Sequence, residues 1–331
     1  MDESLRWPPG SDDVTLDYKR GGEEVEKISV VIPCLNEGEA LRDTSAELIR
    51  QFDLSGMRYL EIIWVDDGSE DSTWDVLKSL RGSENVSHTV VRLRRNFGHQ
   101  AAILAGLAHS TGRSVGVMDS DLQDPPSVLF EMFQKLGGDI EVVYGIRRKR
   151  SAHVALRFAY DSFYRVLGRL SSFPVPRAVG DFRVMTRRVV DELLQLPESD
   201  KFLRGLVPYL GARSLGLEYE RPARVAGKTK FSFSKLLGLA TAGITSVSVL
   251  PLKISTVFGF IVAGLAFIGA FWVVASRIGG ADWPDGWASA ILAIFLIGGL
   301  QMVFLGILGE YLGVVVREVK GRPSFYIDQV H

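Results

Sequence analysis

The sequence predicts an α/β fold with a mostly parallel sheet, followed by a membrane-spanning region. Short apolar runs of strand length alternate with helix-length segments between residues 28 and 145. Repeated β-α units of this kind form a parallel sheet with helices on both faces. Polar motifs follow most of the apolar runs, and two long uncharged runs lie near the C-terminus. These observations indicate a catalytic or binding domain attached to a bilayer.

Residues 1–26 precede the first apolar run. They are polar and acidic, and Pro8, Pro9 and Gly10 interrupt them. We expect a flexible tail here rather than a signal peptide. The formal net charge of the whole chain is −1, which gives no reason to expect a nucleic-acid partner. Cys34 is the only cysteine, which fits a reducing compartment, and its apolar neighbours indicate a small buried side chain rather than a nucleophile.

The expected strands are short, apolar and rich in β-branched residues. They cover residues 28–32, 60–65, 89–93, 115–118 and 140–145, with further candidates at 182–185 and 215–219. Pro33 is expected to break the first of them. The expected helices have helical apolar spacing or a capping sequence at their start. They cover residues 40–52, a segment opening at 71–73, and residues 100–109 and 127–136.

Two uncharged runs predict membrane spans. Residues 254–276 and 286–309 are about 23 and 24 residues long, enough to cross a hydrocarbon core about 30 Å thick. Glu310 ends the second run. Lysine and arginine residues flank the outer ends of the pair, whereas the loop between the spans has only Arg277. The positive-inside rule therefore predicts a multi-pass membrane protein with its large domain in the cytoplasm. Small residues within both spans are compatible with homo-oligomerisation.

Polar segments follow five of the expected strands. They are Pro33–Glu37, Asp66–Ser69, Asn96–His99, Asp119–Asp121 and Gly145–Arg147. The carboxyl ends of parallel strands form one ligand-binding rim, so these segments should converge. Neither a dinucleotide-binding glycine motif nor a P-loop is present. Asp119 and Asp121 could bind Mg²⁺ or Mn²⁺ together with substrate phosphates, although a solvated acidic turn is the simpler alternative.

The combined motifs resemble those of one enzyme family. They are Val31–Glu37, Val65–Ser69, Arg95–Gly98, Met118–Pro126 and Gly180–Arg183. Over about residues 27–326 the chain is similar to the inverting family 2 glycosyltransferases that act on polyisoprenyl phosphates. The resemblance implies a GT-A nucleotide-diphospho-sugar transferase domain at 27–230, juxtamembrane amphipathic helices at 231–250, two transmembrane helices within 251–314 and a cytoplasmic tail at 315–331.

The same resemblance implies the reaction. A hexose would move from a nucleotide sugar to undecaprenyl or dolichyl phosphate at the cytoplasmic face of the membrane. UDP-glucose is the first donor to consider, and mannose, N-acetylhexosamine and aminoarabinose derivatives stay open. A processive polysaccharide synthase is a competitor, but its Gln-x-x-Arg-Trp motif is absent from the sequence. A catalytically inactive nucleotide-binding scaffold is another, against which the complete acidic motifs argue.

Site residues follow from the motifs by resemblance. Those implied to bind the nucleotide sugar are Pro33, Asn36, Glu37, Asp67, Asp119 and Arg147. Those implied to hold the metal ion are Asp119, Asp121 and Gln123, and Asp121 is also counted as catalytic. Ser120 replaces the alanine that is usual inside the Asp-x-Asp motif, and it should be tolerated.

The remaining expectations concern the lipid acceptor. Asp181 and Arg183 are expected to be catalytic, with Asp181 either a general base or a group that orients the donor or metal. A lipid phosphate has a second pKa near 6, so it is already nucleophilic at neutral pH and a base is dispensable. Cations should hold this phosphate. The candidates are Arg183, Arg224, Lys228 and Lys230, whereas Arg148–Arg150 are expected to be a solvated surface.

Overall fold

The computed structural model describes residues 27–147, 179–198, 201–220 and 286–331, with isolated residues between 252 and 279. The chain forms two compact units, one of residues 1–161, 173–228 and 323–331 and one of residues 162–172 and 229–322. The expectations for the tail at 1–26, for Arg148–Arg150 and for the helices at 231–250 lie outside the described residues. So do those for Arg224, Lys228 and Lys230.

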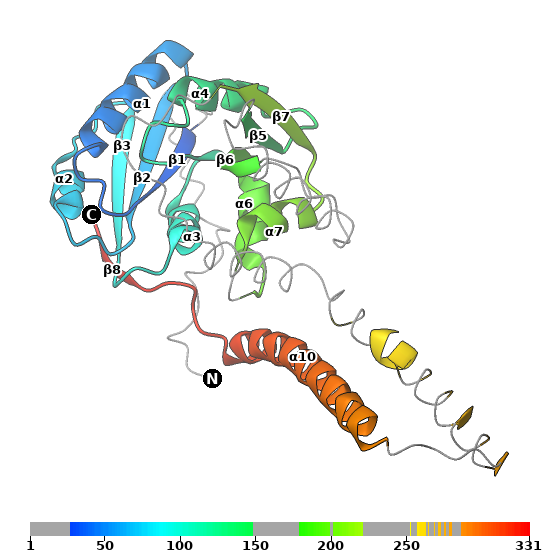
Figure 1. Cartoon of the computed structure of the whole chain (residues 1–331). Coiled ribbons are helices and arrows are strands. Elements are labelled where there is room, and N and C mark those ends of the chain that lie inside the picture. Colours follow the sequence, from blue (N-terminus) through cyan, green and yellow to red (C-terminus); the bar gives the residue numbers. More distant parts are fainter. Residues whose placement is uncertain are drawn as a thin grey trace, which may run out of the picture. The chain divides into compact units, whose positions relative to one another are not determined.

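An eight-stranded sheet forms the centre of the first unit (Figure 1). Its strands are β1 (Lys27–Cys34), β2 (Tyr59–Asp66), β3 (Val86–Leu93), β4 (Ser114–Val117), β5 (Val142–Arg147), β6 (Val179–Thr186), β7 (Ser214–Tyr219) and β8 (Ile327–Val330). Their order is β7-β5-β6-β4-β1-β2-β3-β8. Strands β6 and β8 run antiparallel to their neighbours, and the other pairs are parallel. The predicted α/β fold with a mostly parallel sheet is confirmed.

Helices cover both faces of the sheet, as predicted. They are α1 (Leu41–Ser55), α2 (Thr73–Ser79), α3 (His99–His109), α4 (Pro126–Lys135), α6 (Arg187–Gln195) and α7 (Leu203–Tyr209). Successive strand residues point to opposite faces. Val30 and Ile32 therefore pack in a core with α1, α2 and α4, whereas Val31 packs in a second core with α3, α6 and α7. The strands read as continuous apolar runs because both of their faces are buried.

Pro33 does not break the first strand, contrary to our expectation. Strand β1 continues through Pro33 to Cys34, and Pro33 pairs in register with Val65 of β2. On the other side, Val31 is the last residue of β1 that pairs with β4. Proline has no N–H to extend that ladder. The ladder between β1 and β4 ends there. After Val117 the chain leaves the sheet and forms the turn that carries Asp119 and Asp121, here called the acidic turn.

Strand β6 explains how a late segment of the chain reaches the rim. Arg183 pairs with Val117 and Tyr144, and Val179 pairs with Ile146. Because β6 is antiparallel, its first residues lie beside the last residues of β4 and β5. Asp181 is therefore placed at the carboxyl ends of the parallel strands, beside the motifs that follow them.

The second unit contains α10 (Trp287–Lys320). Among the described residues, one helix is long and apolar enough to cross a membrane, at Ile297–Lys320 within α10. This differs from the expected span at residues 286–309, because Glu310 does not end the helix and Gly321 does, with a φ of 53°. The expected span at 254–276 lies largely outside the described residues and stays a prediction.

Candidate active site

The loops after β1 and β2 are joined through Asn36. Its backbone N–H donates to the Ser69 hydroxyl at 2.9 Å, and its side-chain oxygen accepts from the Glu70 N–H at 3.0 Å. Asn36 has a φ of 55°, a left-handed conformation that asparagine tolerates better than most residues. Glu37 follows, and its N–H donates to the Thr73 hydroxyl. The two loops therefore form one continuous edge of the site.

Asp67 is joined to the loop between β3 and α3, residues 94–98. Its carboxylate accepts the N–H groups of Phe97 at 2.7 Å and Gly98 at 2.9 Å. Burial nevertheless raises the pKa of this carboxyl group above its ordinary value. Gly68 has a φ of 72°, and a Cβ there would lie 2.5 Å from the carbonyl carbon of Arg95. Only glycine allows the two loops to approach so closely.

The turn that carries Asp119 and Asp121 is held from both ends. The Thr44 hydroxyl of α1 donates to the Ser120 carbonyl at 2.7 Å. The Asp121 carboxylate accepts the Gln123 N–H at 3.1 Å. Burial raises the pKa of Asp119, and the neighbouring carboxylates of Asp124, Asp121 and Asp181 contribute to that rise. A cation at this turn would relieve the repulsion between these acids.

His99, the first residue of α3, lies between two acids of the rim. Its Nε2 atom is 3.6 Å from the Asp119 carboxylate and 3.4 Å from the Asp181 carboxylate. Burial alone would lower the pKa of His99, but the two carboxylates raise it above its ordinary value. His99 thus joins the acidic turn after β4 to the start of β6.

Asp181 is buried and surrounded by hydrogen-bond donors. Arg204 of α7 donates to both of its oxygens, at 3.1 and 2.7 Å, and Arg183 and Gln100 each donate at 3.1 Å. Burial alone would raise the pKa of Asp181, but the hydrogen bonds from His99 and Arg204 and the charge of Arg183 hold it well below its usual range. A carboxylate held in this way is a weak proton acceptor.

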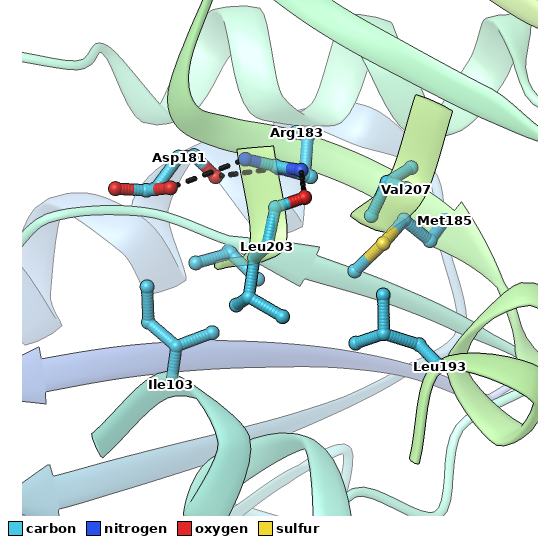
Figure 2. Close-up of a pocket in the computed structure, with 8 residues that line it drawn as sticks. Ile103, Asp181, Arg183, Met185, Leu193, Leu203 and Val207 are labelled. Carbon is cyan, nitrogen blue, oxygen red and sulfur yellow. Dashed lines mark hydrogen bonds and ion pairs between the residues drawn. The ribbon is translucent and has the colours of Figure 1, made fainter. Parts of the chain in front are cut away.

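Arg183 lies behind Asp181 and is only 2% exposed. Its guanidinium donates to the carbonyls of Gly180, Asp181 and Leu203 as well as to the Asp181 carboxylate, as Figure 2 shows in part. The small space beside it is lined mainly by apolar side chains, which are Ile103, Val117, Met185, Leu193, Leu203 and Val207. Arg183 is therefore held by backbone carbonyls and by the Asp181 carboxylate, and its expected contact with a lipid phosphate stays a prediction.

Arg147 belongs to a buried polar cluster with Asp124 and Tyr219. The Tyr219 hydroxyl at the end of β7 donates to the Asp124 carboxylate. Arg147 donates to the Tyr219 hydroxyl at 3.1 Å and to Asp124 at 3.4 Å. Asp124 is only 1% exposed. Asp124 is therefore the buried acceptor on which this cluster is built.

The donor set at the acidic turn is compatible with a divalent metal ion. Among the described residues, no three His, Cys, Asp or Glu side chains are grouped so that they could hold a metal ion by themselves. Magnesium commonly takes one or two carboxylates and completes its shell with substrate phosphates and water. Asp119, Asp121 and the Gln123 amide supply hard oxygen ligands of this kind. These side chains therefore form a complete metal site only together with oxygen atoms of a bound diphosphate.

Contacts in the described part of the chain connect four of the five polar segments predicted to converge. In the fifth segment, Arg147 contacts Asp124, three residues after the Asp119–Asp121 segment. Sequence reasoning missed His99, Gln100, Arg204, Asp124 and Tyr219 as parts of the network. His99 lies inside one of the predicted segments, and its ring could have been weighed as a partner for the acids. Arg204 follows Asp181 by 23 residues with no motif around it. Cys34 is buried, and burial raises the pKa of its thiol, in agreement with the structural role expected of it.

Comparisons with known proteins identify the family. The family model described as "Glycosyl transferase family 2" matches residues 29–194. An uncharacterized glycosyltransferase of Bacillus subtilis, YkoT, is 39% identical over 91% of this chain and 91% of its own length. The prophage bactoprenol glucosyl transferase homolog of Escherichia coli is 36% identical over 92% of this chain and 99% of its own. The bactoprenol glucosyl transferase of Shigella phage SfX is 36% identical over 91% and 98%. The chain therefore belongs to glycosyl transferase family 2 and is a glycosyltransferase with a GT-A-like α/β fold.

Proposed function

We propose that this enzyme transfers a hexose from a nucleotide diphosphate sugar to a polyisoprenyl phosphate, with inversion at the anomeric carbon. UDP-glucose is the first donor to test. Mannose, N-acetylhexosamine and aminoarabinose derivatives are the alternatives. The acceptor is undecaprenyl or dolichyl phosphate, and the reaction takes place at the cytoplasmic face of the membrane.

The observation that supports this proposal best is the extent of the match to the bactoprenol glucosyl transferases. The likeness covers 98% of the Shigella phage SfX protein, so it is not limited to the nucleotide-binding sheet. It extends over the region of this chain that includes α10. Enzymes that join a soluble donor to a lipid acceptor need both a nucleotide site and a bilayer attachment. A chain that carries both a GT-A-like domain and an apolar helix long enough to cross a membrane is compatible with that requirement.

The rim supplies the groups that a nucleotide sugar needs. Asp67 and the loop at Asn36 and Glu37 would hold the nucleotide, and Arg147 would contact the donor. Asp119, Asp121 and Gln123 would hold Mg²⁺ or Mn²⁺, which neutralises charge on a diphosphate leaving group. Their hard oxygen ligands support this assignment, as does the raised pKa of Asp119, to which burial contributes most and the neighbouring carboxylates contribute further.

The structure supports an orienting role for Asp181 rather than a general base. Two arginines and His99 surround its carboxylate, and its pKa is well below the usual range. The acceptor phosphate, with a second pKa near 6, does not require deprotonation at neutral pH. An oxygen of this phosphate would attack the anomeric carbon while the bond to the diphosphate breaks, and the nucleoside diphosphate leaves with the electron pair. The His99 ring and the Arg204 guanidinium are the partly exposed groups beside this reaction centre.

We propose two spans, of which α10 contributes the second, with the first compact unit on the cytoplasmic side. Arg224, Lys228 and Lys230 are proposed to bind the acceptor phosphate, because their positive charges would attract an anionic lipid headgroup. Homo-oligomerisation through small residues of the spans remains part of the proposal.

A donor panel with one lipid acceptor tests the proposed function. Detergent-solubilised full-length enzyme is incubated with undecaprenyl phosphate, Mg²⁺ or Mn²⁺, and labelled UDP-glucose, GDP-mannose or UDP-N-acetylglucosamine. We expect one donor to give a label in the organic phase that depends on both lipid and metal ion. The proposal is wrong if no donor labels the lipid while the enzyme still binds nucleotide, because an inactive scaffold would behave in that way.

A further inference from the structure

We propose that the C-terminal segment Phe325–His331, here called the C-terminal clamp, positions the nucleotide site by holding the loop of residues 94–98. The clamp follows α10 in the sequence, but residues 323–331 belong to the first compact unit, here called the catalytic unit. The inference rests on the proposed function in one respect, because it takes Asp67 as a nucleotide contact. The contacts that carry the inference all lie within the first unit.

The clamp is attached to the edge of the sheet by backbone hydrogen bonds. Strand β8 pairs antiparallel with β3, with Val330 opposite Val91 and Gln329 opposite Arg92. His331 exchanges two further hydrogen bonds with Val90, each 2.8 Å long. The side chains of Phe325 and Ile327 pack on the core that α3 shares with the sheet. The last residues of the chain are therefore a structured part of the catalytic unit.

Tyr326 connects the clamp to the loop. Its carbonyl accepts the Arg94 N–H at 2.9 Å, and its ring lies 6.1 Å from the ring of Phe97. The Arg94 guanidinium lies over the Tyr326 ring at 5.9 Å. Phe97 itself packs against the same core as Phe325. The clamp therefore contacts the loop at both its first residue and its fourth.

The loop in turn holds Asp67. The N–H groups of Phe97 and Gly98 are donors to the Asp67 carboxylate, at 2.7 and 2.9 Å. Gly98 also precedes His99, which contacts the acids of the rim. A movement of Phe97 would therefore displace both the Asp67 carboxylate and the first residue of α3. The clamp reaches the site only through this loop, so it is a positioning element and its residues are not catalytic.

Steady-state kinetics of the full-length enzyme test the inference. The variants are Tyr326→Ala and a truncation after Ser324, and Tyr326→Phe is the conservative variant that keeps the ring. Gln329→Ala is the matched control, because its side chain is exposed while its backbone pairing is retained. We expect the donor KM to increase about tenfold in the truncation, the effect of losing one well-placed hydrogen bond to a charged group. Tyr326→Phe and Gln329→Ala should keep the wild-type donor KM.

Amide hydrogen exchange provides a second measurement that does not depend on catalysis. Without nucleotide, the N–H groups of Phe97 and Gly98 should exchange at least tenfold faster in Tyr326→Ala than in the wild type. Unchanged exchange there, together with an unchanged donor KM, would overturn the inference and leave the clamp a role in stability alone. If no nucleotide sugar is turned over by the wild type, the proposed function fails while the exchange rates still decide whether the clamp holds the loop.

Discussion

The substitution Asp181→Asn should destabilise the catalytic unit, because it removes the charge that faces Arg183. Arg183 is 2% exposed and Asp181 6%, so the pair is shielded from water. Removing one partner of a buried ion pair costs about 3–5 kcal/mol. We expect the lower end, about 3 kcal/mol, because the carbonyls of Gly180 and Leu203 still accept hydrogen bonds from Arg183.

Thermal unfolding of the detergent-solubilised enzyme measures this loss. A catalytic unit of this size loses about 2–4 °C in Tm per kcal/mol, so Asp181→Asn should lower the Tm by about 10 °C. Asp121→Asn is the matched control. The Asp121 carboxylate accepts the Gln123 N–H within its own turn, and its substitution should leave the Tm within about 2 °C of the wild type. If the Tm of Asp181→Asn is unchanged while its activity is abolished, the Asp181 carboxylate does not stabilise the fold through Arg183. That result would refute this reasoning and favour a catalytic base.

Three further predictions address other parts of the molecule. Tyr219→Phe removes the hydroxyl that joins Asp124 to Arg147, and we expect kcat/KM for the donor to fall about tenfold, whereas Tyr326→Phe should leave it unchanged. Glu61 is buried, which alone would raise its pKa, but donors including Lys27 lower it. The stabilisation that Glu61 contributes is therefore complete above its unfolded pKa of about 4.3, and it is lost as the pH falls through the lower folded pKa. Glu61→Gln should consequently make the free energy of unfolding depend less on pH in the acid range, which a series of unfolding experiments at different pH values measures. Removal of divalent ions with EDTA should abolish transfer, and Mg²⁺ or Mn²⁺ should restore it; activity that persists in EDTA would contradict the metal assignment.

The arrangement of the rim could be predicted from the sequence because the signal is local. Each motif directly follows an apolar run, and parallel strands bring their carboxyl ends together. Asn36, Asp67, Asp119 and Asp121 consequently lie on connected loops, as expected. The burial of Cys34 was predictable for the same reason, since its neighbours are apolar.

Other features depend on contacts distant in the sequence. The direction of β6 decides that Asp181 reaches the rim, and no local pattern reveals that direction. Arg204 approaches Asp181 only because α7 packs on the second face of the sheet. Tyr219 contacts Asp124 only in the folded chain, because the two residues lie 95 positions apart in the sequence.

Two expectations from the sequence are wrong, and in each of them a single residue was expected to end a strand or a helix. Proline often ends a strand, but Pro33 lies where the neighbouring strand β4 has already ended, so it removes no hydrogen bond that the sheet needs. Glu310 was expected to end the apolar helix. It is one charge in a long helical segment, and the termination occurs at Gly321, which adopts the left-handed conformation that glycine allows.

The most direct test of the proposed reaction is transfer of labelled glucose from UDP-glucose to undecaprenyl phosphate by purified enzyme, compared between the wild type and Asp121→Asn. We expect a lipid-linked, metal-dependent product from the wild type, with the anomeric configuration inverted. Asp121→Asn should form this product at least a hundredfold more slowly at an unchanged Tm, which corresponds to the loss of one transition-state contact of about 3 kcal/mol. Equal rates for the two proteins would contradict the assignment of the acidic turn as the reaction centre.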